Sequence, residues 1–412
     1  MWLLDKALRR LLRRGQLTVT DHQGTTRVYG NPDPELRSVA VRFTDRRVPT
    51  EIARDPGLGA AETYMDGRLI LEQGDILDLV TLIRRNNRWE DKGARKDGFL
   101  RKGGKLKNRL DRLNWQRRSK RNVAHHYDIG DQLYELFLDA DMQYSCAYFT
   151  DPGNSLERAQ LDKKAHIAAK LALKPGQRVL DIGCGWGGMA LYLNRVAGVE
   201  VLGITLSEEQ LRTARARAEA AGVADKVRFE LIDYRDLTGR FDRIVSVGMF
   251  EHVGPPQFRT FFAKCRELLT DDGVMLLHTI GRMGKPGTTD RFMQKYIFPG
   301  GYVPALSETL AASEHERLIM TDCETLRFHY YYTIRHWYDR VTAQKDEIVR
   351  RYDERFLRLW LFYLAGAMTM FTESGMVNYQ IQYARRRDAL PMTRNYMFDE
   401  ETRLGSLGAN PA

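Results

Sequence analysis

Residues 178–189 read RVLDIGCGWGGM, and this stretch decides the fold. Apolar residues of strand character run into a loop rich in glycine, and a segment that favours a helix follows. Glycine has no Cβ, so the backbone can turn tightly and approach a ligand closely. The pattern predicts a strand–loop–helix unit that binds a nucleoside ligand at the carboxyl edge of a parallel sheet.

The glycine loop alone fits two kinds of nucleoside ligand, or a plain tight turn that binds none. Gly183, Gly185 and Gly188 have the G-x-G-x-x-G spacing of dinucleotide-binding proteins, but a similar loop also serves S-adenosylmethionine. A dinucleotide fold places an acid about 20 residues further on, at the end of its second strand, where it binds the ribose. Here the second predicted strand, residues 199–204, ends at Thr205. Thr205 therefore favours S-adenosylmethionine and disfavours an NAD-dependent oxidoreductase.

Length and composition predict a protein of two or three domains. The chain has 412 residues, of which 43% are hydrophobic, enough to form real cores. Its nearest approach to a membrane span, residues 359–368, is shorter than the roughly 18 apolar residues required, so we expect a buried helix there. The N-terminus lacks the apolar core of a secretory signal and the four cysteines lack metal-ligand spacing. We expect a cytoplasmic protein without a structural metal.

The chain divides by composition into four parts. Residues 1–90 predict a small α+β domain that opens with a basic amphipathic helix, which either lies on a membrane surface or packs on its own domain. Residues 91–121 hold thirteen Lys or Arg against three Asp, a net charge of +10 that equals that of the whole chain. Residues 122–399 form the predicted catalytic domain, and residues 400–412 a tail.

The basic segment 91–121 is typical of a flexible linker that meets a polyanion. An anionic membrane surface attracts such a segment through its many positive charges. Nucleic acid is disfavoured because no module that reads bases is visible nearby. A solvated linker without a partner stays open as the alternative.

Residues 122–399 alternate between predicted strands and helices. The predicted strands are residues 178–182, 199–204, 227–231, 241–247 and 273–279. The alternation indicates a Rossmann-like, doubly wound sheet whose ligand crevice lies at the carboxyl ends of the strands. Glu251 and His278 follow the fourth and fifth strands, so we expect both on the ligand side. Each of them alone also fits an ordinary polar residue at a strand end.

The sequence resembles the cyclopropane-fatty-acyl-phospholipid synthases and is similar to the mycolic acid methyltransferases. The former are bacterial S-adenosylmethionine-dependent enzymes that add a methylene across the cis double bond of a phospholipid acyl chain. The matching stretches are residues 122–130, 142–149, 183–188, 203–207 with Gln210, 233–237, 241–254 and 296–301.

This resemblance implies two sets of site residues. S-adenosylmethionine would be surrounded by Tyr144, Ser145, Asp181, Gly183, Gly185, Thr205, Gln210, Asp233 and Tyr234. A bicarbonate ion would be held by Cys146, Glu251, His278, the backbone of Ile280 and a tyrosine that we assign to Tyr330, with Tyr331 and Tyr332 as alternatives. The alkene would take the methyl group, aromatic faces would stabilise the resulting carbocation, and the ion would remove the proton that closes the ring. No metal is required.

The resemblance also implies where the protein works. We expect a homodimer, peripherally associated with the inner face of the membrane, that acts on unsaturated phospholipid acyl chains at an anionic surface. Methyl transfer without ring closure stays open as an alternative. A lipid-binding protein without catalytic activity is disfavoured, because Glu251, His278 and Cys146 are all present.

Overall fold

The computed structural model describes residues 1–91 and 131–407. The chain splits into two compact units. The N-terminal unit takes residues 1–104, 289–299 and 334–375, and the sheet unit takes residues 105–288, 300–333 and 376–412. Two segments of the predicted domain 122–399 thus group with the N-terminal residues. Nearly all of the basic segment 91–121, the matching stretch 122–130 and the last five residues of the tail lie outside the described residues.

The N-terminal unit mixes helices and strands, as the sequence predicts. A four-stranded sheet runs in the order β2-β1-β3-β4, with β1 and β3 parallel. Its elements are α1 (Trp2–Leu11), β1 (Gly15–Thr20), β2 (Thr26–Asn31), β3 (Val39–Phe43), α2 (Val48–Arg54), α3 (Pro56–Met65), β4 (Leu69–Gln73) and α4 (Ile76–Arg85). Later segments add α14 (Lys345–Arg351), α15 (Glu354–Thr372) and most of α13 (His329–Ala343).

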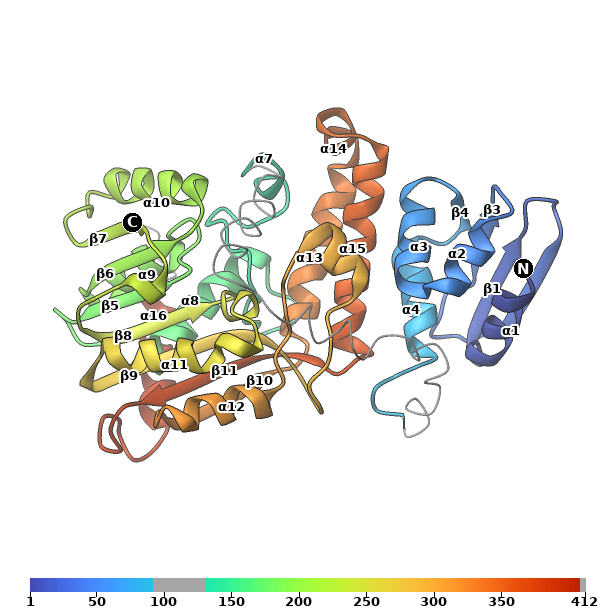
Figure 1. Cartoon of the computed structure of the whole chain (residues 1–412). Helices are drawn as coiled ribbons and strands as arrows, with labels where there is room; N and C mark the ends of the chain where they lie inside the picture. Colours follow the sequence, from blue (N-terminus) through green and yellow to red (C-terminus); the bar gives the residue numbers. More distant parts are fainter. Residues whose placement is uncertain (92–130, 408–412) are drawn as a thin grey trace. The chain divides into compact units, whose positions relative to one another are not determined.

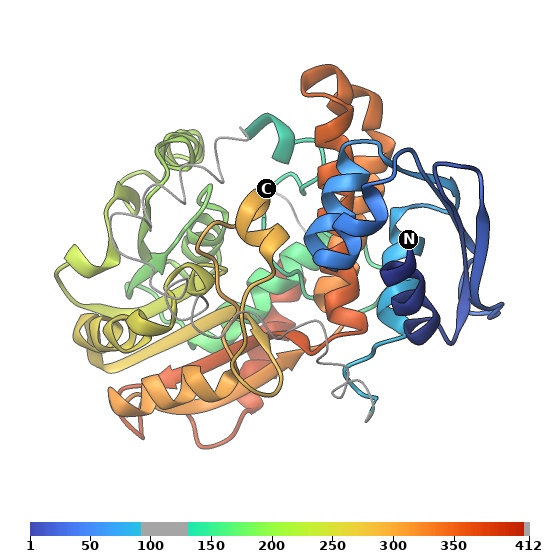
Figure 2. The ribbon, with the colours of Figure 1, turned by 45° about the vertical axis from the view of Figure 1, so that its right-hand side comes forward.

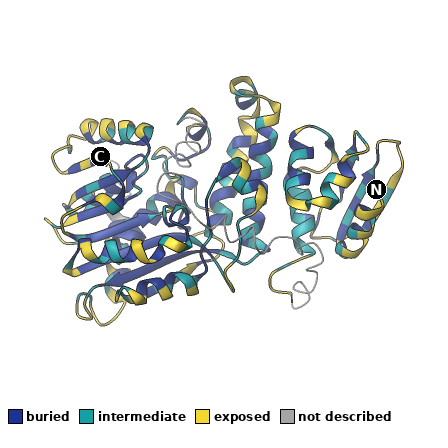
Figure 3. Ribbon diagram, in the orientation of Figure 1, coloured by how far each residue is buried: buried dark blue, intermediate teal, exposed yellow. Residues whose placement is uncertain are grey.

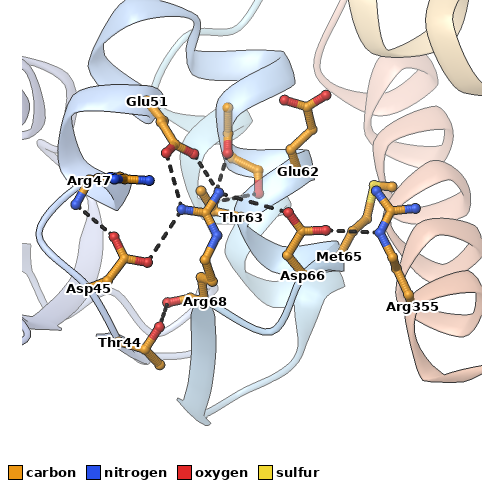
Figure 4. A network of polar contacts seen from close by, with 12 residues as sticks. Thr44, Asp45, Arg47, Glu51, Glu62, Thr63, Met65, Asp66, Arg68 and Arg355 are labelled. Carbon is orange, nitrogen blue, oxygen red and sulfur yellow. Dashed lines mark hydrogen bonds and ion pairs between the residues drawn. The ribbon is translucent and has the colours of Figure 1, made fainter.

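An ionic network explains why residues distant in sequence belong to the N-terminal unit (Figure 4). Arg68 donates to Glu51 of α2 at 2.5 Å and to Asp45 at 3.4 Å. Asp66, close to Arg68, accepts from Arg355 of α15 at 2.9 Å. Asp66 therefore links the α2–α3 region to a helix that lies almost 300 residues further along the chain.

The sheet unit is built on a seven-stranded sheet with the order β10-β11-β9-β8-β5-β6-β7 (Figures 1 and 2). Its strands are β5 (Arg178–Ile182), β6 (Glu200–Thr205), β7 (Val227–Leu231), β8 (Phe241–Val247), β9 (Leu269–Arg282), β10 (Ile319–Leu326) and β11 (Met376–Ala384). The strands from β5 to β9 are parallel, and β11 runs antiparallel to both of its neighbours. The predicted Rossmann-like fold is confirmed, although the sequence did not predict β10 and β11.

Helices cover both faces of this sheet. α8 (Leu156–Leu171), α9 (Gly188–Ala197), α10 (Glu208–Ala220) and α16 (Asn395–Leu407) share one core with the strand residues Val179 and Val245. α11 (Phe258–Leu268) and α12 (Leu306–His315) share the other core with Leu180 and Ile244. Successive strand residues point to opposite faces, so the apolar runs of β5 and β8 fill both cores and the strands are buried (Figure 3).

The topology fixes where a ligand can bind. From β5 the chain proceeds outward to β6 and β7, and it then returns to β8 and β9 on the other side. The direction reverses between β5 and β8, and in open α/β sheets the ligand crevice lies at the carboxyl ends of the strands at this point. The apolar run 359–368 lies in α15, where Trp360 and Leu364 are buried as predicted. None of the described helices has the length and apolar character needed to cross a bilayer.

Gly203 in β6 gives a test of this packing. A Cβ at Gly203 would lie 2.5 Å from the ring of buried Phe229, so we expect Gly203→Ala to destabilise the protein by about 1–3 kcal/mol, the usual cost of overpacking. The thermal unfolding midpoint measures the effect. Gly366→Ala in α15 is the matched control, because a Cβ there meets nothing within 4 Å and should be neutral or stabilising. Equal midpoints for the two variants would contradict the described packing.

Candidate active site

A pocket lies at the carboxyl ends of β5, β6 and β8, where the topology predicts it. Its lining residues lie within five stretches of the sheet unit, residues 142–145, 181–189, 204–210, 232–235 and 247–253, and Glu251 is not one of them. It includes every residue that the resemblance assigned to the cofactor: Tyr144, Ser145, Asp181, Gly183, Gly185, Thr205, Gln210, Asp233 and Tyr234. The structure therefore brings this whole set together.

The glycine loop has the geometry that its sequence predicts at Gly183. This residue has φ of +80°, in the left-handed region that favours glycine, and a Cβ there would lie 2.8 Å from the side chain of Met249. Only glycine lets the end of β5 turn this sharply so close to the loop that follows β8. The tight turn leaves the pocket open above the strand ends.

Asp181 gives the pocket an unsatisfied acceptor. Its Oδ2 atom is buried and has no hydrogen-bond partner among the described residues. Burial raises the pKa of Asp181 to about 7, against a smaller opposing effect of the Lys163 charge. A buried polar atom without a partner is costly, so this oxygen favours a ligand that donates hydrogen bonds. The ammonium and ribose hydroxyl groups of S-adenosylmethionine meet that requirement, and the residues of the pocket fit this cofactor.

Polar contacts fix the other cofactor residues in place. Thr205 Oγ1 donates to Gln210 Oε1 at 2.9 Å, which ties the end of β6 to the first turn of α10. Asp233 accepts from Arg235 Nε at 2.8 Å and from Nη2 at 2.5 Å. Arg235 and His252 also line the pocket, and sequence reasoning missed both of them. Burial lowers the pKa of His252 to about 4, so its imidazole is neutral near pH 7.

Two of the residues assigned to bicarbonate, Glu251 and Ile280, are in direct contact next to the pocket. Glu251 lies in a short 3₁₀ helix, Phe250–His252, and its Oε1 accepts from the backbone N–H of Ile280 at 2.6 Å. Its Oε2 is buried without a hydrogen-bond partner among the described residues. Burial raises the pKa of Glu251 to about 7. One oxygen of the carboxyl group is thus held by a hydrogen bond, and the other can accept a hydrogen bond from a ligand.

His278 lies two residues before Ile280 on β9 and is fully buried. Its backbone carbonyl accepts from the N–H of Gly248, a pocket residue, at 2.9 Å. Its ring nitrogens face two amide side chains of β11, Gln380 at 3.2 Å and Asn378 at 3.4 Å. Burial and the charges of Lys163 and Lys170 lower the pKa of His278 well below its usual value.

Cys146 and Tyr330 lie in two segments that are joined by hydrogen bonds between their neighbours. The thiol of Cys146 donates to the carbonyl of Ala147 at 3.3 Å, and burial raises its pKa. The backbone N–H groups of Ala147 and Phe149 donate to the side chains of Thr333 and His329, which flank Tyr330. Tyr330 is buried, whereas Tyr331 and Tyr332 are half-buried and pack edge to face on each other.

Lys163 of α8 was not predicted from the sequence, although it stands close to this region. The residue is fully buried, and its Nζ donates to Gln143 Oε1 at 2.6 Å and to Ser145 Oγ at 2.9 Å. Burial lowers its pKa to about 8. Its charge acts on the pKa values of both Cys146 and His278. A cation therefore lies between the cofactor pocket and the residues assigned to an anion.

Known proteins similar to this chain include cyclopropane synthases and fatty acid methyltransferases. A family model described as mycolic acid cyclopropane synthetase matches residues 114–381. The probable fatty acid methyltransferase of Pseudomonas putida is 42% identical over 289 residues, which cover 67% of this chain and 73% of that protein. The cyclopropane-fatty-acyl-phospholipid synthase of Escherichia coli K12 is 39% identical over 334 residues, which cover 81% of this chain and 85% of that protein.

One similar solved structure contains bound SAH. The mycolic acid cyclopropane synthase CmaA1, complexed with SAH and CTAB, matches with a TM-score of 0.62 at 31% identity. The match covers 66% of this chain and 99% of that chain. The preference for S-adenosylmethionine over a dinucleotide, which we based on Thr205, is confirmed by these relatives.

The buried carboxyl of Glu251 predicts a pH-dependent stability. Its pKa is about 7 in the folded protein and 4.5 when unperturbed, so between these values the folded state holds a proton that the unfolded chain has released. Stability therefore falls as the pH rises through this window. Glu251→Gln lacks the effect, and its unfolding free energy relative to the parent should rise by up to about 3 kcal/mol from pH 4.5 to above pH 7.

Urea unfolding at a series of pH values measures this difference. Glu230→Gln, at an exposed position of β7, is the matched control, for which the difference from the parent should stay constant. If the difference in unfolding free energy from the parent were also constant for Glu251→Gln, the pKa of the Glu251 carboxyl would not be raised in the folded protein.

Proposed function

Because the chain belongs to the mycolic acid cyclopropane synthetase family of S-adenosylmethionine-dependent methyltransferases, we propose that it forms cyclopropane rings on the unsaturated acyl chains of phospholipids. The observation that carries the proposal is the position of Glu251. Its neighbours Met249, His252 and Val253 line the cofactor pocket, whereas its own carboxyl is buried behind the pocket with an unpartnered oxygen. An acceptor so placed suits a reaction that must remove a proton beside the cofactor.

The cofactor and the ion each supply one part of this chemistry. When bound, S-adenosylmethionine supplies an activated methyl carbon that an alkene can attack directly, and bicarbonate supplies the base for the proton that ring closure releases. On this chain, Asp181, Thr205, Gln210 and Asp233 would hold the cofactor in the pocket. The Oε2 atom of Glu251 would contact the ion, and His278 would donate a hydrogen bond to it.

Aromatic side chains beside the pocket support a cationic reaction path. The ring of Tyr144 lies 4.9 Å from that of Tyr134, edge to face, and Tyr134 lies 5.4 Å from Trp186. Tyr144 and Trp186 both line the pocket. Aromatic faces attract cations without reacting with them, so this cluster would stabilise positive charge during methyl transfer.

Helix α1 offers a contact with the membrane that contains the lipid. Leu4 and Leu8 are buried on its own unit, as the more conservative interpretation of this helix predicts. Trp2 and Leu3 nevertheless stay 70% and 60% exposed, beside the exposed side chains of Lys6 and Arg10. Exposed apolar tips among basic residues are typical of segments that insert at anionic bilayer surfaces. We propose that α1 and the basic segment 91–121 dock the protein there; the homodimer stays a prediction.

Methyl transfer without ring closure is the second candidate function. It is favoured by the name of the Pseudomonas relative, a probable fatty acid methyltransferase. The two candidates share the pocket and the substrate class and differ in the fate of the methyl protons, so product analysis separates them.

Incubation with CD3-labelled S-adenosylmethionine and vesicles of cis-unsaturated phospholipid tests the proposal. We expect acyl chains that have gained one labelled carbon with two of its three deuterons and have lost the double bond, because ring closure releases the third deuteron to the base. Mass spectrometry and proton NMR of the released fatty acids identify the ring. Retention of all three deuterons would establish a methyl branch and reject cyclopropanation.

Glu251→Gln provides the matched variant for this assay. It should retain S-adenosylmethionine binding by calorimetry, because Glu251 does not line the pocket, and lose turnover by about 10²–10⁴-fold, the usual contribution of general acid–base groups. Glu230→Gln should behave as the parent. Undiminished turnover in Glu251→Gln would remove the proposed role of this carboxyl.

Docking is tested by sedimentation with vesicles of different anionic lipid content. We expect binding to rise with anionic lipid and to fall with salt. The double variant Trp2→Ser, Leu3→Ser should bind about tenfold or more weakly, since each buried apolar side chain contributes about 1.5–3 kcal/mol. Val28→Ser, which changes a 51% exposed residue of β2, is the control and should bind as the parent does. Binding that is indifferent to both anionic lipid and salt would exclude docking of this kind.

A further inference from the structure

A chain of buried polar side chains leads from helix α8 to His278. Lys170 of α8, Gln380 of β11 and His278 of β9 each expose at most 2% of their surface. Lys170 Nζ donates to Gln380 Oε1 at 2.8 Å, and Gln380 Nε2 lies 3.2 Å from His278 Nδ1. Lys170 also donates to the carboxylate of Glu324 on β10. Of these residues, only His278 has a part in the function proposed above.

The chemistry of lysine fixes the orientation of the Gln380 amide. A lysine ammonium group only donates hydrogen bonds, so the atom of Gln380 that faces Lys170 must be the oxygen. The NH₂ group of the same amide then faces His278. An NH₂ group only donates, so His278 Nδ1 must accept and carries no proton.

The proton of the neutral imidazole is therefore on Nε2. Burial and the nearby cations Lys163 and Lys170 keep the ring neutral, since they lower the pKa of His278. Nε2 lies 3.4 Å from the Asn378 side chain, whose Oδ1 is buried without a partner among the described residues. While no anion is bound, a half-turn of the Asn378 amide supplies an acceptor for the Nε2 proton and gives this oxygen its partner.

The strand register shows to which side the Nε2–H group is directed. Gln380 pairs with His278 across β11 and β9, and Asn378 pairs with Ile280. Nδ1 therefore lies beside Gln380, the residue paired with His278. Nε2 lies beside Asn378, the residue paired with Ile280. The Ile280 N–H donates to Glu251, so the free carboxyl oxygen of Glu251 belongs to this same end of β9.

We infer that Lys170 and Gln380 are positioning residues that lock His278 in the neutral Nε2–H tautomer. The only N–H donor of this imidazole is then directed toward the Glu251 end of β9. The opposite tautomer would place that donor on Gln380 and leave Nε2 unable to donate to an anion. The inference deepens the proposed function, because it rests on an anion held by Glu251 and His278 during turnover.

Gln380→Glu in the full-length protein tests the inference. The side chain keeps nearly the same shape, but its donating NH₂ group is replaced by an oxygen that accepts. A carboxylate at this position can still accept from Lys170, but it must accept from His278 as well, which requires a proton on Nδ1. The protonation of both ring nitrogens is read from the ¹⁵N chemical shifts of protein labelled with ¹⁵N-histidine. The signals of His278 are identified by their loss in His278→Asn.

We expect the parent protein to show a protonated Nε2 and a bare Nδ1 at His278, and Gln380→Glu to show a protonated Nδ1. Turnover of Gln380→Glu should fall about 10- to 100-fold, by analogy with residues that orient metal-binding histidines, while S-adenosylmethionine binding is unchanged. Lys170→Met, which frees the Gln380 amide to turn, should give signals of both tautomers.

Gln382→Glu is the matched control. It makes the same buried change on β11, where Gln382 contacts the Lys170 carbonyl and Tyr396 and not His278. We expect it to lower the thermal midpoint as Gln380→Glu does, with the His278 tautomer and the turnover of the parent. A protonated Nδ1 in the parent, or an unchanged tautomer in Gln380→Glu, would overturn the inference. Since tautomers are measured without substrate, failure to form a ring would reject the proposed function and leave this result standing.

Discussion

The hydrogen bond between the Glu251 carboxyl and the backbone of Ile280 is the contact on which the arrangement of the site depends. It joins the loop after β8 to the last part of β9, the two strands next to the point where the sheet topology reverses. Burying a carboxyl is costly, and one backbone donor satisfies only one of its oxygens. The fold accepts this cost at a place where neighbouring residues line the cofactor pocket. A polar ligand at Oε2 would recover part of it, and an enzyme that needs an acceptor beside its cofactor benefits from holding one unsatisfied.

The sequence predicted the parallel part of the sheet well and its antiparallel edge not at all. β5, β7 and β8 have the predicted bounds, because strands buried on both faces are short apolar runs between turn residues. β11 reads MVNYQIQYA, in which Asn378, Gln380 and Gln382 alternate with apolar residues. Such alternation normally indicates a strand with one solvated face. The structure buries all three amides instead. Gln380, for example, contacts the Lys170 side chain of α8, and no local pattern reveals a partner that lies 210 residues away.

The candidate site shows the same contrast between residues that local sequence predicts and residues that only the packing reveals. Most of the cofactor residues follow strand ends or lie in the glycine loop, so local sequence and the resemblance placed them together, and the whole set lines one pocket. The residues that set the state of His278 come from β11 and from α8, a helix that buries Lys163 and Lys170 together with His166. Lysine and histidine at helical positions are ordinarily read as a solvated face. Only the three-dimensional packing shows that these positions face the sheet, so the sequence named His278 without the groups that orient it.

The buried charges of the sheet unit argue for an anion near His278. Lys163 is fully buried, and its Nζ donates to the neutral oxygens of Gln143 and Ser145. The carboxylates of Asp139 and Asp141 offset only part of its desolvation, since its pKa is still lowered to about 8. His278 adds no charge because it is neutral, and the Glu251 carboxyl is half-protonated near pH 7. A small anion held by Glu251 and His278 would stabilise the buried ammonium, and a cationic cofactor in the adjacent pocket would in turn be stabilised by that anion.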